Sequence, residues 1–136
     1  MKRILIADDQ PTARELVGTI LSYSGYETHE AVDGLDAVVQ AWKVLPDLIL
    51  LDIHMPGQDG FAVCRQLRAD PRFAEVPIVA MTAGLMSGER ERALSSGFTE
   101  FLGKPISLTQ LRQTVDRLLE EPVLTHLIAK GVAADS

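Results

Sequence analysis

Short aliphatic runs alternate with amphipathic stretches along most of the chain. Residues 4–7, 48–51 and 77–81 are too short for helices of their own, and such runs are typical of strands buried on both faces. Residues 26–32 are more polar but rich in β-formers, which predicts a strand at the edge of the sheet. A fifth strand is predicted over residues 98–102. The pattern therefore indicates one largely buried sheet.

Between these runs, apolar residues recur three or four positions apart, as in amphipathic helices. The positions expected to mark four helices are, in chain order, Ala13, Leu16, Val17, Ile20 and Leu21; Leu35, Val38, Val39 and Trp42; Phe61, Cys64 and Leu67; and Leu108, Leu111, Val115, Leu118 and Leu119. On the third of these helices, Arg65 and Arg68 are expected to face water. One more helix, from about residue 89 to Gly97, is short and strongly charged, so we expect it to be held loosely. Five strands alternating with five helices predict an α/β domain with a parallel sheet covered on both sides.

The last helix defines the expected end of the domain. Ser107 is a suitable cap for its start, and Pro122 interrupts any continuation. Residues 1–121 are thus expected to form one domain and residues 122–136 a C-terminal tail. Both a helical turn with an apolar stripe and a disordered segment stay open for that tail.

Composition and charge narrow the class of protein. Of the 136 residues, 46% are hydrophobic and 24% charged, which is ordinary for a globular protein. The formal net charge of -6 argues against binding to nucleic acid or to an anionic membrane. Cys64 is the only cysteine, which excludes an internal disulfide and a cysteine-based metal cluster. Acidic residues follow the N-terminus too closely for a signal peptide, and no apolar run is long enough to span a membrane. We therefore expect a cytoplasmic protein.

Four of the five apolar runs end in polar groups that could take part in chemistry. In chain order these are the pair Asp8 and Asp9, then Asp52, Thr82 and Lys104. Because the carboxyl ends of parallel strands share one edge of a sheet, we expect these groups to meet there. Taken singly, each is explained as well by a turn, a cap or a solvated side chain. Together they suit a phosphoryl site: carboxylates bind Mg²⁺, a carboxylate can attack phosphorus, and an ammonium neutralises phosphoryl oxygens.

From residue 3 to about residue 120, the sequence resembles the receiver domain of two-component response regulators. The resemblance rests on motifs in the order and spacing of that family, namely Asp8-Asp9, Asp52-x-x-Met55-Pro56-x-x-x-Gly60, Thr82-Ala83 and Lys104-Pro105. It implies a flavodoxin-like three-layer fold, in which a five-stranded parallel sheet of order 2-1-3-4-5 is packed with five helices. It further implies a single-domain, chemotaxis-regulator-like protein, although an output domain beyond the tail stays open.

The resemblance also implies roles for the residues at the strand ends. Asp52 would accept a phosphoryl group from a histidine kinase or a phosphotransfer protein. Asp9, Asp52 and the backbone carbonyl of His54 would hold Mg²⁺, with Asp8 acting largely through bound water. Lys104 would pair with the phosphoryl group. The chain would then be a signalling phosphoacceptor rather than an enzyme, with Mg²⁺-dependent self-phosphorylation and autodephosphorylation as its only reactions.

Three further expectations concern the response to phosphorylation. Thr82 would move toward the phosphoryl group and Phe101 would turn inward behind it, although a core phenylalanine at a strand end needs no signalling role. The Lys104–Pro105 peptide bond would be cis. His54, the second residue after the phosphoacceptor, is expected to affect autodephosphorylation, and an unchanged decay rate in His54→Ala would contradict this.

The implied partners are proteins. The first helix and the loop after Lys104 would face the kinase, and a downstream protein would bind the face made by the fourth helix, fifth strand and fifth helix. No direct nucleic-acid or membrane partner is expected, and a homodimer stays open. The pathway requires a histidine kinase or a phosphotransfer protein as phosphoryl donor.

Two other functions remain as alternatives. Phosphohydrolases of the haloacid dehalogenase type also form an aspartyl phosphate, but they typically carry a second Asp where this chain has His54. A binding module that takes no phosphate is the other alternative, against which the complete acidic set and Lys104 argue. Dinucleotide binding is excluded because the first strand is followed by Asp-Asp-Gln-Pro and not by a glycine-rich turn.

Overall fold

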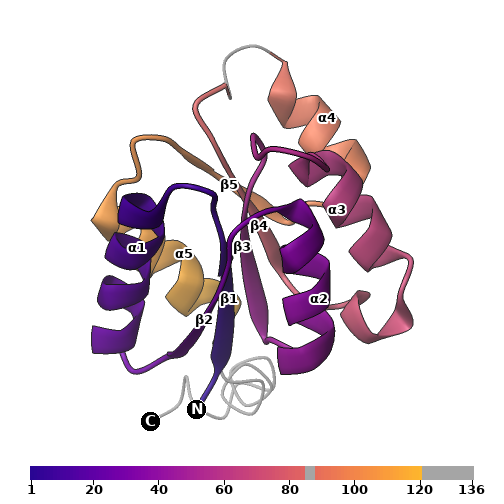
Figure 1. Ribbon diagram of the computed structural model, residues 1–136. Coiled ribbons are helices and arrows are strands. Elements are labelled where there is room, and N and C mark those ends of the chain that lie inside the picture. The colour runs from indigo at the N-terminus through magenta and orange to yellow at the C-terminus, as the bar shows by residue number, and fades with distance from the viewer. Residues whose placement is uncertain (85–87, 121–136) are drawn as a thin grey trace, which may run out of the picture.

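The computed structural model describes residues 1–84 and 88–120. In chain order, its elements are β1 (Arg3–Ala7), α1 (Pro11–Tyr23), β2 (Glu27–Ala31), α2 (Gly34–Val44), β3 (Leu48–Asp52), α3 (Gly60–Arg68), a 3-10 helix η1 (Pro71–Phe73), β4 (Ile78–Thr82), α4 (Glu89–Ser96), β5 (Glu100–Gly103) and α5 (Leu108–Leu118). The strands form one parallel sheet of order β2-β1-β3-β4-β5 (Figure 1). The predicted flavodoxin-like fold and its strand order are confirmed.

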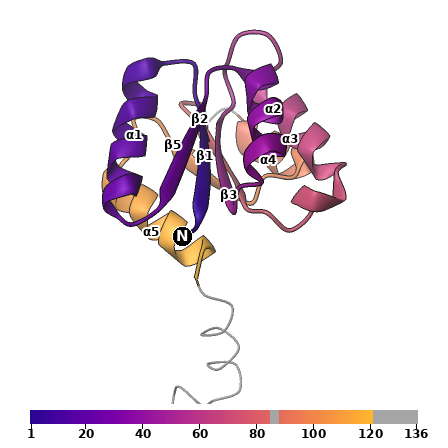
Figure 2. The same ribbon diagram turned by 60° about the horizontal axis from the view of Figure 1, so that its bottom comes forward.

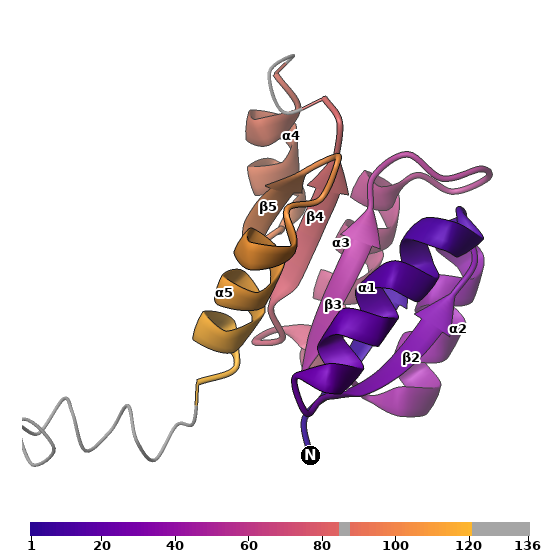
Figure 3. The ribbon, with the colours of Figure 1, turned by 90° about the vertical axis from the view of Figure 1, so that its left-hand side faces the viewer.

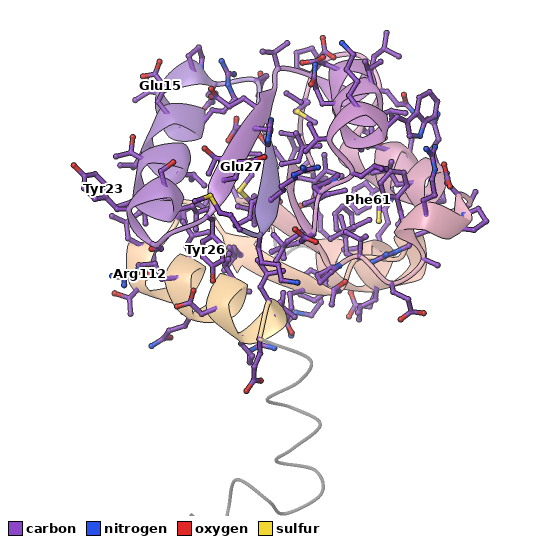
Figure 4. All side chains as sticks on the ribbon, turned by 90° about the horizontal axis from the view of Figure 1, so that it is seen from below. Glu15, Tyr23, Tyr26, Glu27, Phe61 and Arg112 are labelled. Atoms are coloured by element: carbon purple, nitrogen blue, oxygen red, sulfur yellow. The ribbon has the colours of Figure 1, made fainter. Side chains whose placement is uncertain are left out.

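The helices form a layer on each face of the sheet, α1 and α5 on one and α2, α3 and α4 on the other (Figure 2). Successive residues of a strand point to opposite layers, so Leu5 packs in the core with α2 and α3, and Ile6 in the core with α1 and α5. All residues of β3 and β4 are buried. Seen from below, Tyr26 lies toward α5, and Phe61 lies among the side chains of the other layer (Figure 4).

Side-chain caps set the starts of three helices. The carboxylate of Asp33 accepts a hydrogen bond from the backbone of Asp36 at the start of α2, and that of Asp59 does the same at the start of α3. Ser107 caps α5, as the sequence predicts. Since Asp59 follows Asp52 closely, its cap also limits where the intervening loop can lie.

Three helices do not bury all of the apolar positions that mark them in the sequence. Apolar residues named for them that instead lie at the surface are Leu16, Leu35, Val39, Trp42 and Leu108. In α2, the fully buried positions include Ala37 and Ala41, whose small side chains let the helix lie close to the sheet. The predicted fifth strand also begins too early, because the backbone N–H of Phe98 still donates to Ala93 at the end of α4.

Arg68 does not simply face water, contrary to expectation. Its guanidinium donates to the backbone carbonyls of Phe73 (2.6 Å), Val76 (2.7 Å) and Gly97 (2.9 Å). It thereby joins the end of α3 to η1, to the segment before β4 and to the end of α4.

Among residues 1–84 and 88–120, no helix is both long and apolar enough to cross a membrane. The tail predicted over residues 122–136 lies outside the described part of the chain.

Candidate functional site

Acidic side chains and a lysine meet at the carboxyl edge of the sheet. Asp8 follows β1, Asp52 ends β3 and Lys104 follows β5. The Nζ atom of Lys104 lies 3.0 Å from Oδ2 of Asp8 and 3.0 Å from Oδ2 of Asp52. One oxygen from each of Asp8, Asp9 and Asp52 lies within 4.8 Å of the others. Side chains up to 96 residues apart in the sequence are thus brought together.

Both buried carboxylates are also held by the loops that follow them. The other oxygen of Asp8 accepts from the backbone N–H of Gln10 at 3.0 Å, and that of Asp52 accepts from the backbone N–H of His54 at 3.0 Å. Each carboxylate therefore binds its own loop with one oxygen and Lys104 with the other. The pair is pre-positioned by the fold.

Gly60 lets the start of α3 lie directly against the loop that follows Asp52. A Cβ atom at this position would lie 2.6 Å from Cα of Ile53 and 2.8 Å from the carbonyl oxygen of Asp52. The backbone N–H of Gly60 donates to the carbonyl of Ile53 at 2.9 Å. Only glycine permits this approach, which fixes the backbone next to Asp52.

Burial dominates the electrostatics of Asp52. Asp52 is only 4% exposed. Desolvation therefore raises the pKa of its carboxyl, even though hydrogen bonds from Lys104 and from the His54 backbone act in the opposite direction. Desolvation alone would lower the pKa of Lys104, but its hydrogen bonds to Asp8 and Asp52 and their charges outweigh it and raise that pKa. Lys104 is therefore charged at neutral pH, and it is shared by two carboxylates.

The carboxylates suit a hard divalent cation. Asp8 and Asp52 are buried, whereas Asp9 is partly exposed and can offer an oxygen from the solvent side. A single ammonium leaves excess negative charge among three carboxylates, and Mg²⁺ prefers such oxygen ligands. The donor set therefore fits Mg²⁺.

Thr82 points away from the aspartates of the site and toward α4. Thr82 is only 1% exposed. Its hydroxyl donates to Oε1 of Glu89 at 2.5 Å and accepts from the backbone N–H of Gly84 at 2.9 Å. The other carboxylate oxygen of Glu89 lies 2.7 Å from Nε2 of His54. Glu89 could not be identified from the sequence, because its only signal was its place at the start of a charged helix.

Phe101 and the peptide after Lys104 complete the expected set. The Phe101 ring is partly buried against the core that includes α2 and α3, and the guanidinium of Arg90 lies 5.3 Å from its centroid. The Lys104–Pro105 peptide bond is cis, as the resemblance implied. The carboxyl ends of β3 and β4 point to this same edge, with α4 beyond it (Figure 3).

An apolar groove of about 340 Å³ adjoins Lys104. It lies between α1 and the segment that connects β5 to α5. Its apolar lining consists of Ala13, Leu16, Val17, Pro105, Ile106 and Leu108. Leu16 and Leu108, two of the exposed apolar residues of these helices, belong to this groove.

The fold and site define a doubly wound α/β domain with an acid–lysine site at the carboxyl edge of its sheet. Within that class, the family model for the response regulator receiver domain matches residues 4–116. The chain belongs to the response regulator receiver domain family, as the sequence resemblance indicated.

Three known proteins illustrate this membership. The chain is 39% identical over 119 residues to the DNA-binding dual master transcriptional regulator RpaA of Synechocystis sp., covering 88% of this chain but only 49% of that protein. It is 34% identical over 118 residues to the polar-differentiation response regulator DivK of Brucella anthropi, covering 87% of this chain and 96% of DivK. The solved receiver domain of the sensor histidine kinase PA1611 from Pseudomonas aeruginosa, with a magnesium ion coordinated in its active site cleft, has a TM-score of 0.82 and 32% identity, with 88% and 98% coverage.

Proposed function

We propose that the protein is a phosphorylation-controlled receiver in which Asp52 accepts a phosphoryl group from a histidine kinase or a phosphotransfer protein. The observation that supports this most is the buried Asp52 carboxylate with Lys104 Nζ at 3.0 Å and the oxygens of Asp8 and Asp9 close by. A carboxylate oxygen of Asp52 attacks phosphorus, the bond to the donor imidazole breaks, and that imidazole leaves with the electron pair. Lys104 neutralises the phosphoryl oxygens during transfer.

Asp8, Asp9 and Asp52, together with the backbone carbonyl of His54, are proposed to hold Mg²⁺. The cation supplies positive charge for the phosphoryl oxygens. The donor chemistry of the three carboxylates supports this assignment, as does the magnesium ion in the related PA1611 receiver domain. The His54 side chain is proposed to affect autodephosphorylation from its place at the mouth of the site.

The proposed partners follow from the surfaces beside the site. The apolar groove between α1 and the segment after Lys104 suits the docking of a kinase or phosphotransfer helix, because Lys104 itself belongs to its lining. Thr82 and Phe101 are the proposed switch residues, and a downstream protein is proposed to read the face of α4, β5 and α5. A cytoplasmic location is part of this proposal.

The test is phosphorylation by a small donor. We expect acetyl phosphate and Mg²⁺ to add one phosphoryl group to the protein, detected by intact-mass spectrometry, and chelation of Mg²⁺ to prevent it. Asp52→Asn is expected to abolish the modification. Asp59→Asn is the matched control, because asparagine also caps a helix and should leave both the start of α3 and the modification intact.

Absence of the phosphoryl group in the wild type, or its persistence in Asp52→Asn, would contradict the proposal. Turnover of organic phosphates by the wild type would instead support the phosphohydrolase alternative.

A further inference from the structure

The first turn of α4 holds residues of the site, although its sequence suggests a solvated charged helix. The side chain of Glu89 is only 19% exposed, and its two oxygens contact Thr82 and His54. The next residue, Arg90, lies over the Phe101 ring. Consecutive residues of α4 therefore contact both proposed switch residues.

The contact between Glu89 and Thr82 competes with any contact between Thr82 and a phosphoryl group. A threonine hydroxyl has a single proton to donate. In this structure that proton is directed to Glu89 Oε1 at 2.5 Å, while the acceptor side of the oxygen takes the N–H of Gly84. Donation to a phosphoryl oxygen therefore requires the bond to Glu89 to break.

The neighbouring charges of the same turn do not share this role. The guanidinium of Arg92 lies 4.1 Å from the ring centroid of Phe61 and 3.9 Å from the carboxylate of Asp59, on the side of α3. Glu91 is exposed, and among the described residues its side chain makes no hydrogen bond or ion pair with the site. Of the two acidic residues in this turn, Glu89 is the one that contacts the site.

We propose that Glu89 is a positioning residue that holds Thr82 and His54 in the resting arrangement and so opposes activation. This inference rests on the proposed function, because the competing ligand is the phosphoryl group on Asp52. Releasing Glu89 frees the hydroxyl of Thr82, and it also frees the turn that places Arg90 over Phe101. Glu89 thereby couples the two switch residues through one helical turn.

The experiment measures the affinity for beryllofluoride, a phosphoryl mimic, in the presence of Mg²⁺. In Glu89→Ala the hydrogen bond no longer has to be broken, so we expect binding to tighten by about three- to tenfold, in line with a charge-assisted hydrogen bond that is partly exposed. Glu89→Gln keeps an acceptor oxygen for Thr82 and should stay within about twofold of the wild type. Glu91→Ala removes the same charge from the same turn and should leave the affinity unchanged.

A double-mutant cycle isolates the contact from general effects on α4. In a Thr82→Ala background the hydroxyl is gone, so adding Glu89→Ala should change the affinity no further. Glu89→Ser is measured in parallel, because the shorter serine side chain cannot reach Thr82 and keeps a polar residue in the first turn of α4. Thermal unfolding of every variant verifies that the domain remains folded.

The outcomes separate this inference from the function on which it rests. If the wild type does not bind beryllofluoride with Mg²⁺, the proposed receiver function is wrong. If the wild type binds and Glu89→Ala and Glu89→Ser bind equally well or more weakly, only the role of Glu89 is wrong. An equal gain in Glu91→Ala would likewise overturn it, because the effect would then come from the charge of the turn.

Discussion

The effect of a methyl group at residue 60 tests how closely the start of α3 must approach the loop that follows Asp52. In Gly60→Ala the new Cβ would lie 2.6 Å from Cα of Ile53 and 2.8 Å from the carbonyl oxygen of Asp52. Both are backbone atoms, which cannot rotate out of the way. Ordinary contacts begin at 3.4 Å, so the two segments must separate by roughly 0.8 Å (3.4 minus 2.6).

This separation has an energetic cost that can be worked out from the contacts. Overpacking of this kind typically costs about 1–3 kcal/mol, and loss of the 2.9 Å hydrogen bond from Gly60 to Ile53 adds about 1 kcal/mol. The expected destabilisation is therefore about 2–4 kcal/mol. At about 3–5 °C per kcal/mol for a domain of this size, the melting temperature should fall by roughly 6–20 °C.

Thermal unfolding followed by circular dichroism provides the measurement, and Gly18→Ala provides the control. Gly18 lies inside α1, and its added Cβ would make only an ordinary contact, 3.7 Å from Cδ1 of Ile6. Alanine should therefore stabilise this helix by about 0.5–1 kcal/mol. A Gly60→Ala protein that melts within about 2 °C of the wild type would refute the close approach, because no room for the methyl group exists in this arrangement.

Two other expectations concern stability. Arg68→Ala should lower the free energy of unfolding, measured by urea denaturation, by about 2–4 kcal/mol, because several backbone carbonyls lose their donor. Arg72→Ala is the control: it removes the exposed ion pair with Asp70 and should leave the urea midpoint almost unchanged. Without metal, the raised pKa of Asp52 means that the folded state binds the proton of this carboxyl more tightly than the unfolded state does. The free energy of unfolding should therefore fall as the pH rises from 3.8 through that raised pKa. Asp52→Asn should remove this pH dependence in urea titrations. If Asp52→Asn left the pH dependence of the free energy of unfolding unchanged, that dependence would come from other groups.

The sheet and the acid–lysine cluster could be predicted from the sequence for a simple physical reason. Strands buried on both faces must be aliphatic throughout, so β3 and β4 appear as uninterrupted apolar runs. In a parallel sheet the carboxyl ends share one edge, so polar residues that end several runs are neighbours in space. Asp52 and Lys104 could therefore be paired although 52 residues separate them.

The orientation of α2 could not be predicted in the same way. Both of its faces carry apolar residues, so the spacing alone did not reveal which face is buried. The structure buries the face with Ala37 and Ala41, because small residues allow close packing, and leaves Trp42 47% exposed. The number of apolar residues on a face is a poor guide where the distance between helix and sheet decides the packing.

Long polar side chains were missed because their partners belong to other elements. Arg68 contacts residues up to 31 positions away, and Glu89 contacts His54 across the site. Neither contact has a period along the chain that a sequence pattern could detect.

Polar contacts with other elements, rather than buried apolar surface, hold much of α4 in place, which makes this helix suited to respond to the site. Its buried residues are only Ala93 and Ser96, so little apolar surface holds this helix in place. Its position therefore depends more on polar contacts, among them the hydrogen bond between Glu89 and Thr82 and the stacking of Arg90 on Phe101. Polar contacts can be exchanged for others at small net cost, whereas buried apolar surface cannot be exposed without a large one. A helix held in this way can change position when Thr82 changes its hydrogen-bond partner, while the sheet and its core stay intact.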